Sequence, residues 1–139
     1  MWESFVAGSS HARTIDVSKE LYEAAKEYCD RTAISFQFLF ESGLYDLIRI
    51  WGGGKPSLES YDEECLQKVK QILRNNPMPG KVDWNERDFH VCIKISSDRT
   101  YQWMVNLESL AIIPSFSDAV RRIMTWALKN EGYFKKTSE

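Results

Sequence analysis

The sequence lacks the features that usually mark an enzyme or a membrane protein. It has two histidines in 139 residues, no glycine-rich phosphate loop and no nucleophile motif, and its carboxylates are scattered over polar helix faces. No apolar run approaches the roughly 18 residues of a membrane span, and residues 1–10 lack the basic start and apolar stretch of an export signal. We therefore expect a protein without catalytic activity that does not enter a membrane.

Cysteine is also scarce, and its spacing excludes a disulfide framework. Cys29, Cys65 and Cys92 are an odd number with no paired spacing, which predicts free thiols in a cytoplasmic protein. His90 and Cys92 alternate along one expected strand with no third donor near them in the sequence, so we expect no metal ion and no cofactor. Cys29 lies on the apolar side of an expected helix and is predicted to belong to the core.

The charge balance excludes a strong field of one sign. The chain has 18 basic and 20 acidic residues and a formal net charge of −2. Any affinity for nucleic acid must then come from a local patch of charge. At 43% hydrophobic residues, the chain is long enough to bury one good core.

The most informative pattern present is a β-α-α unit that occurs twice. In residues 13–48, Ile15 and Val17 alternate with polar neighbours as in a half-buried strand, Ser18 supplies a helix N-cap, and a second, more apolar helix follows Ser35. Residues 91–128 repeat this order.

In the second unit, Ile93 and Ile95 alternate with Cys92 and Lys94, and Ser96 takes the place of Ser18. The segment Pro114-Ser115-Phe116-Ser117 is expected to start its second helix, and Ser117 followed by Asp118 is a stronger start signal than any in the first unit. A strand of about five residues cannot satisfy its own backbone groups. We therefore expect the two strands to pair antiparallel within the chain, along Ile15 and Ile93.

The two units are separated by an insertion. Gly52–Pro56 ends the first unit, and one amphipathic helix is predicted between Ser60 and Asn75, with an acidic first turn. Trp51 and Trp84 lie in this insertion, where they either cover the core or form an exposed contact patch, and core cover is the preferred interpretation. Trp103 and Trp126 have the spacing of helix residues that face a core.

These patterns predict a mainly α fold with a short two-stranded antiparallel ribbon. The expected organisation is a first unit at 11–50, a linker with one helix at 51–89 and a second unit at 90–130, with both units in one compact domain. The chain would then be a pseudo-dimer with an internal twofold.

Both units resemble the ribbon-helix-helix (Arc/MetJ-like) DNA-binding family. The stretch I-D-V-S-K-E-L-Y-E-A-A-K-E-Y-C-D-R-T-A-I-S follows the family pattern without gaps, whereas the second unit has about two extra residues near Ile112–Pro114. In that family, strands from two chains form a ribbon that enters the major groove of DNA. The resemblance implies sequence-specific binding of duplex DNA, as a transcriptional regulator, a repressor for example, or as a plasmid or phage accessory factor.

The resemblance also implies which residues contact DNA. The base-facing side chains would be Ala12, Thr14, Asp16, His90, Cys92 and Lys94. Phosphate would be held by backbone amides at the starts of the second helices and by basic side chains, namely Ser35, Phe36, Gln37, Ser115, Phe116, Ser117, Arg13, Arg121 and Arg122.

The chain departs from the family at two of these positions. Ribbons of the family usually present Arg, Lys, Gln or Asn, whereas Ala12 offers no polar group and Asp16 carries the same sign of charge as phosphate. Lys94 could donate to guanine, Thr14 could touch a thymine methyl group, and protonated His90 could donate a hydrogen bond. Because the two strands differ, the expected DNA site is asymmetric.

The acidic balance leaves an alternative open. The scaffold could have lost DNA binding and serve as an inhibitor or adaptor that binds a protein partner through the middle helix or through exposed tryptophans. The two units could also pair between chains rather than within one, giving a homodimer with two ribbons.

Light scattering distinguishes pairing within a chain from pairing between chains. Internal pairing predicts a particle of 16.2 kDa. A particle of twice that mass at micromolar concentration would contradict it.

Overall fold

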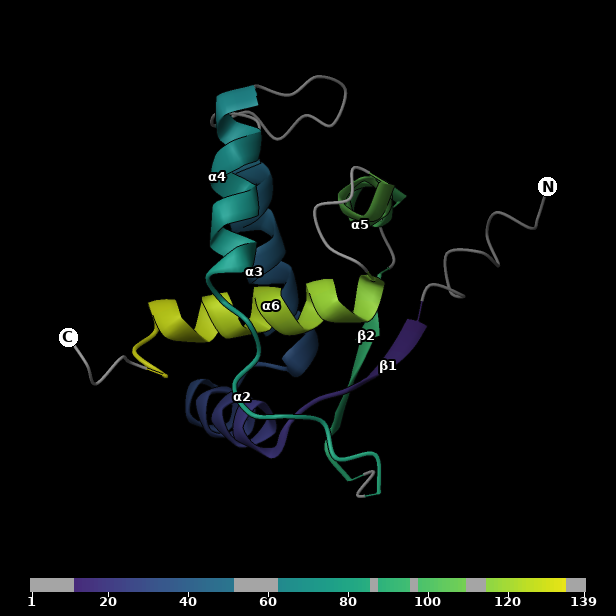
Figure 1. Cartoon of the computed structure of the whole chain (residues 1–139). Coiled ribbons are helices and arrows are strands. Elements are labelled where there is room, and N and C mark those ends of the chain that lie inside the picture. The colour runs from purple at the N-terminus through teal and green to yellow at the C-terminus, as the bar shows by residue number, and fades with distance from the viewer. Residues whose placement is uncertain (1–11, 52–62, 86–87, 96–97, 110–114, 135–139) are drawn as a thin grey trace.

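The computed structural model describes residues 12–51, 63–85, 88–95, 98–109 and 115–134. These residues form two strands and five helices (Figure 1). In chain order they are β1 (Ala12–Asp16), α2 (Lys19–Thr32), α3 (Phe36–Trp51), α4 (Glu63–Arg74), β2 (His90–Lys94), α5 (Asp98–Ser109) and α6 (Phe116–Asn130). The expected mainly α fold with a short ribbon is confirmed, as is the helix in the insertion.

The strands β1 and β2 pair antiparallel as a two-stranded sheet. Ile15 lies opposite Val91, and Ile93 lies opposite Arg13, so the two isoleucines named from the sequence are diagonal neighbours. Both are buried on the same face of the ribbon, which rests on the helices. The pairing continues one step beyond β1, where the Val17 amide donates to the Phe89 carbonyl at 2.9 Å.

Each strand is held by a helix from the other β-α-α segment. α3 packs against β2, and α6 packs against β1. The Gln37 side chain donates to the Lys94 carbonyl and accepts from the Lys94 amide, both at 2.6 Å. At the end of β1, Arg121 Nε donates to the Asp16 carbonyl at 2.8 Å. Neither segment could therefore satisfy its strand without the other.

The helices α3 and α6 cross at the centre of the core. Their buried faces include Phe40, Leu44 and Leu47 from α3 with Ile123 and Met124 from α6. A Cβ atom added at Gly43 would lie 3.0 Å from Ile123 Cγ2 and 3.3 Å from the Ile123 carbonyl oxygen. Glycine thus allows the two helix backbones to approach closely.

The connector after α4 is tied to the start of α2 through Ser18. Ser18 is the N-cap of α2, since its Oγ accepts from the Leu21 amide at 3.1 Å, and the same hydroxyl donates to the Pro79 carbonyl at 2.5 Å. Ser18 is fully buried. The N-cap expected from the sequence is therefore also the anchor for a segment sixty residues away.

Local expectations for the second unit have different outcomes. The helix α6 begins where expected: Ser115 is its N-cap, because its Oγ accepts from the Asp118 amide at 3.1 Å, and Ser117 is already in the first turn. Ser96 lies outside the described residues. Trp103 is buried, but Trp126 is only half-buried, because it faces a groove between three helices.

Two predictions for single residues are confirmed. Trp51 is buried and packs edge-on against Trp103 with ring centroids 5.3 Å apart, so it covers the core as expected. The same interpretation was wrong for Trp84, which is 60% exposed. Cys29 also belongs to the core.

The close crossing of α3 and α6 predicts the effect of a substitution. Gly43→Val should lower the free energy of unfolding by about 2 kcal/mol, since the added methyl groups force α6 away from α3. Ser42→Val is the matched control, because Ser42 is exposed on the same helix. It should change stability by less than about 0.5 kcal/mol. Equal unfolding midpoints of the two variants in urea would contradict the tight crossing.

Candidate nucleic-acid interface

The ribbon presents six side chains on the face turned away from the core. Antiparallel register places Ala12 opposite Lys94, Thr14 opposite Cys92, and Asp16 opposite His90. Side chains alternate along a strand, so these three cross-strand pairs share one face. Five of the six residues are exposed and Asp16 is partly buried. All six positions expected to face bases therefore lie together on one face of the ribbon.

The chemistry of this face changes from one end to the other. Lys94 and the methyl group of Ala12 lie at one end, and Asp16 and His90 lie at the other. Thr14 and Cys92 are central, with Oγ1 and Sγ 3.7 Å apart. A ligand bound along the ribbon would meet a cation at one end and a carboxylate at the other.

The start of α3 contains a helix N-cap and a side chain that holds the neighbouring strand β2 by hydrogen bonds. Ser35 Oγ accepts from the Phe38 amide at 3.0 Å. The Gln37 side chain is used for the backbone of Lys94 and for Glu41, whose carboxylate accepts from it at 2.8 Å. The Phe36 ring packs against Tyr22 with centroids 5.7 Å apart. A phosphate at this helix start would thus depend on backbone amides and not on the Gln37 side chain.

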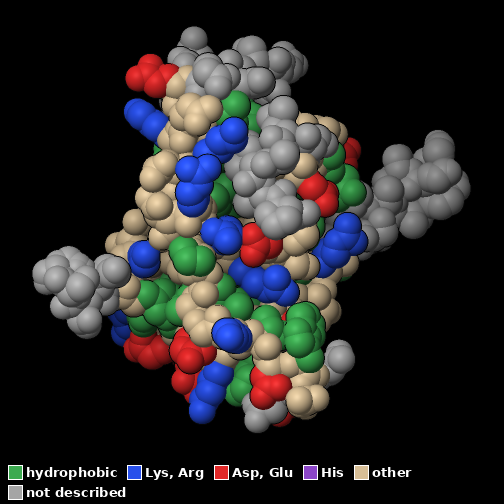
Figure 2. All heavy atoms as spheres, viewed as in Figure 1, with side chains coloured by type: hydrophobic (Ala, Val, Ile, Leu, Met, Phe, Trp, Pro, Cys, Tyr) green, Lys and Arg blue, Asp and Glu red, His purple; other side chains and the backbone are tan. Residues whose placement is uncertain are grey.

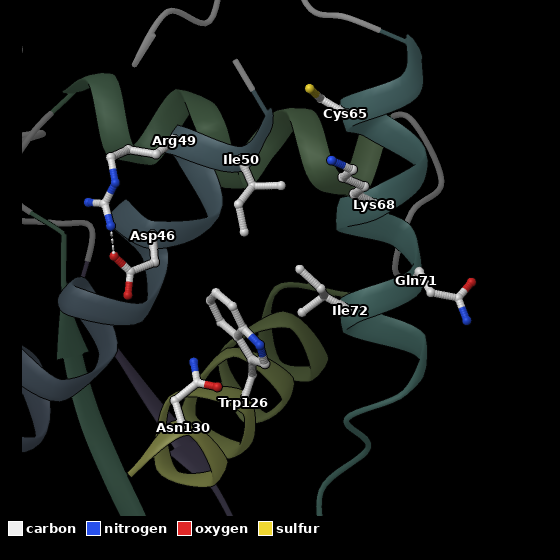
Figure 3. Close-up of a pocket in the computed structure, with 9 residues that line it drawn as sticks. All are labelled: Asp46, Arg49, Ile50, Cys65, Lys68, Gln71, Ile72, Trp126 and Asn130. Atoms are coloured by element: carbon white, nitrogen blue, oxygen red, sulfur yellow. Dashed lines mark hydrogen bonds and ion pairs between the residues drawn. The ribbon is translucent and has the colours of Figure 1, made fainter. Parts of the chain in front are cut away.

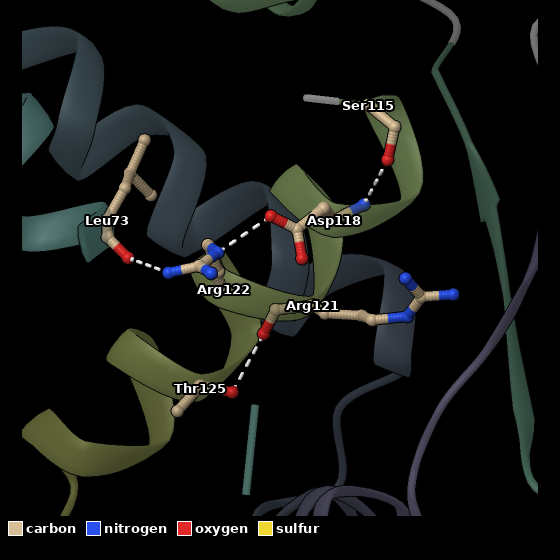
Figure 4. A network of polar contacts seen from close by, with 6 residues as sticks. All are labelled: Leu73, Ser115, Asp118, Arg121, Arg122 and Thr125. Carbon is tan, nitrogen blue, oxygen red and sulfur yellow. Dashed lines mark hydrogen bonds and ion pairs between the residues drawn. The ribbon is translucent and has the colours of Figure 1, made fainter. Parts of the chain in front are cut away.

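The start of α6 is built in a similar way but carries a carboxylate (Figure 4). Ser115 caps the Asp118 amide, and the Asp118 carboxylate accepts from Arg122 Nε at 2.7 Å. The ring of Phe116 lies under the guanidinium of Arg13, 5.0 Å from its centroid. The Asp118 carboxylate brings negative charge to this helix start, and its pairing with Arg122 offsets part of that charge.

The three arginines expected to supply affinity already have contacts within the protein. Arg13 stacks on Phe116, Arg121 holds the end of β1, and Arg122 also donates through Nη1 to the Leu73 carbonyl at 2.6 Å. Figure 4 shows the Arg121 guanidinium directed toward the two strands. Arg121 therefore lies beside the ribbon, whereas Arg122 serves to join α4 to α6.

The distribution of charge over the surface is mixed. In the view of Figure 2, Lys and Arg side chains gather over α4 and α6, and Asp and Glu side chains gather over α2. The grouping of basic residues over α4 and α6 has no counterpart in the sequence, because the two helices come from distant parts of the chain.

Comparisons with known proteins found no match among protein-family models, curated proteins or solved structures. Among the described residues, no helix has both the length and the apolar character to cross a bilayer. The same residues hold no group of three or more His, Cys, Asp or Glu side chains arranged around a common point.

The three thiols should differ sharply in reactivity. Burial, with a smaller contribution from the charge of Asp30, raises the pKa of Cys29 to about 11, whereas Cys92 is exposed on the ribbon. Since the thiolate is the reactive form, we expect maleimide at pH 7 to modify Cys92 rapidly and Cys29 only on unfolding. Peptide mass mapping over time measures this order. Modification of Cys29 as fast as Cys92 in the native protein would contradict the register of the ribbon and the packing of α2.

Proposed function

We propose that this protein binds duplex DNA without catalysis, by inserting the ribbon of β1 and β2 into the major groove. In this proposal, the chain is a tandem ribbon-helix-helix pseudo-dimer and acts as a transcriptional regulator or as a plasmid or phage accessory factor. The observation that carries the proposal is the shared outward face of Thr14, Cys92 and Lys94 on a ribbon supported from behind by two helices.

The reciprocal support of the strands favours a paired arrangement. α3 of the first segment holds the end of β2, and α6 of the second segment holds the end of β1. Such an exchange is what two intertwined β-α-α units require. It gives a stiff ribbon, and a stiff ribbon loses little conformational entropy on entering a groove.

The side chains of the outward face have the chemistry to read base edges. Lys94 can donate to guanine O6 and N7, Thr14 can contact a thymine methyl group, and Asp16 can accept from cytosine N4. The two strands differ at every paired position. The DNA site in this proposal is accordingly asymmetric.

Phosphate contacts in this proposal come from both sides of the ribbon. Ser35 and Ser115 each cap the start of a helix. The first backbone amides of a helix have no acceptor within the helix, and such amides attract anions. Arg121 lies beside β1 and adds a cation. These contacts would position the ribbon without adding sequence information.

Titration with genomic and random duplexes at low and moderate salt tests the proposal. Lys94→Ala should weaken binding about tenfold, in the range expected for one lost base contact. Lys70→Ala on α4 is the matched control, and it should leave affinity unchanged within about twofold. Bound duplex should also slow maleimide labelling of Cys92 but not that of Cys65, which lies on α4. Absence of binding, or equal effects of the two lysine variants, would contradict the proposal.

A second candidate is a protein-interaction module, and the aromatic surface of α3 favours it. Phe38 and Tyr45 are 55% and 48% exposed and lie seven residues apart on one face of α3, and Trp84 is 60% exposed. The middle helix, α4, offers less exposed apolar surface to a partner, because its side chains Leu66, Val69 and Leu73 are buried against neighbouring helices. Two results together would favour this candidate over DNA binding. The protein would fail to bind heparin or duplex DNA, and a partner protein bound by the wild type would no longer bind the Phe38→Ser variant.

A further inference from the structure

A groove of about 880 Å³ lies between α3, α4 and α6 (Figure 3). Ile50 from α3, Ile72 from α4 and Trp126 from α6 point into it. All three side chains are half-buried. The groove is built from two consecutive helices, α3 and α4, and from the distant helix α6, and none of its lining residues belongs to the outward face of the ribbon.

The floor of the groove is apolar and partly exposed to water. Covering this apolar surface is favourable by about 25 cal/mol for each Å² removed from water. Its volume lies within the roughly 300–1,000 Å³ of sites for small ligands. The indole ring of Trp126 offers a flat surface on which another aromatic ring can stack.

The charges around the groove leave one cation uncompensated. Asp46 and Arg49 form an ion pair with each other at the rim. Lys68 extends from α4 toward the groove, and within the described part of the chain it takes part in no ion pair. Among the charged residues that line the groove, Asp46, Arg49 and Lys68, the balance is therefore positive by one charge.

We propose that this groove binds a small aromatic carboxylate. The aromatic ring of this ligand lies on Trp126 between Ile50 and Ile72, and the carboxylate of the ligand pairs with the ammonium group of Lys68. This site is independent of DNA binding, so it can fail or succeed without affecting the function proposed above.

Cys65 gives a direct reporter of occupancy, because it lines the groove and its sulfur points toward it in Figure 3. Cys92 on the ribbon is the internal reference. Naphthoate is a suitable probe, and naphthamide is its uncharged counterpart of almost the same shape. We expect naphthoate to slow maleimide labelling of Cys65 with a half-maximal effect on the order of 1 mM, the ordinary range for a ligand of this size. Labelling of Cys92 should not change.

Two variants identify the groups responsible. Lys68→Met should weaken naphthoate about fivefold, the effect of losing one partly exposed ion pair, and should leave naphthamide unchanged. Lys70→Met on the same helix is the control and should alter neither probe. Trp126→Ala should abolish protection by both probes, with circular dichroism to verify that the variant remains folded.

Three results would overturn the proposal. They are equal affinity of naphthoate and naphthamide for the wild-type protein, an equal effect of Lys68→Met and Lys70→Met, and no protection of Cys65 at 10-fold the expected half-maximal concentration. The last result would also be obtained if the groove accepted only a helix of another protein.

Discussion

The pairing of β1 with β2 is the constraint on which the rest of the structure depends. Each strand is five residues long and has backbone groups that its own segment cannot satisfy. Joining them brings two segments that are seventy-eight positions apart in the sequence into contact, as the register between Thr14 and Cys92 shows. Once they are joined, Ile15, Val91 and Ile93 form one apolar face, and α3 and α6 must cross behind it.

The ends of the ribbon show how side chains complete a sheet that has only two strands. The Gln37 amide makes two hydrogen bonds with the Lys94 backbone, in the manner of a neighbouring strand, and Arg121 covers the last carbonyl of β1. These contacts reduce the unpaired edge that an isolated ribbon would expose. They also commit polar side chains near the outward face to structure, which leaves Lys94 as the cation on that face.

The helix α6 connects the ribbon with the groove. Its first half holds β1 through Arg121 and joins α4 through Arg122, and its second half supplies Trp126 to the groove (Figure 4). The hydrogen bond from Arg122 to the Leu73 carbonyl at 2.6 Å fixes α4 against α6, so the width of the groove depends on the same helix that supports the ribbon. The ribbon and the groove are thus both supported by α6, although they lie at different places on the molecule.

Much of the secondary structure could be predicted from the sequence because it depends on local chemistry. Alternation around Ile15 and Ile93 specified the strands, Ser18 specified the start of α2, and the outward set from Ala12 to Lys94 followed from the period of two. The sequence also marked the start of α6, but Ser115 and Ser117 are equally good caps by residue type, and only the hydrogen bond to the Asp118 amide distinguishes them.

The sequence by itself determined that two β-α-α segments, separated by one amphipathic helix, occur in this protein, because periodicity and capping act over a few residues. Only the tertiary structure decided the diagonal placement of Ile15 and Ile93, the use of Arg121 and Gln37 to hold the opposite strand, and the groove formed around Trp126. Those features depend on distances between side chains that are far apart in the sequence, and such distances are fixed by packing across the whole core.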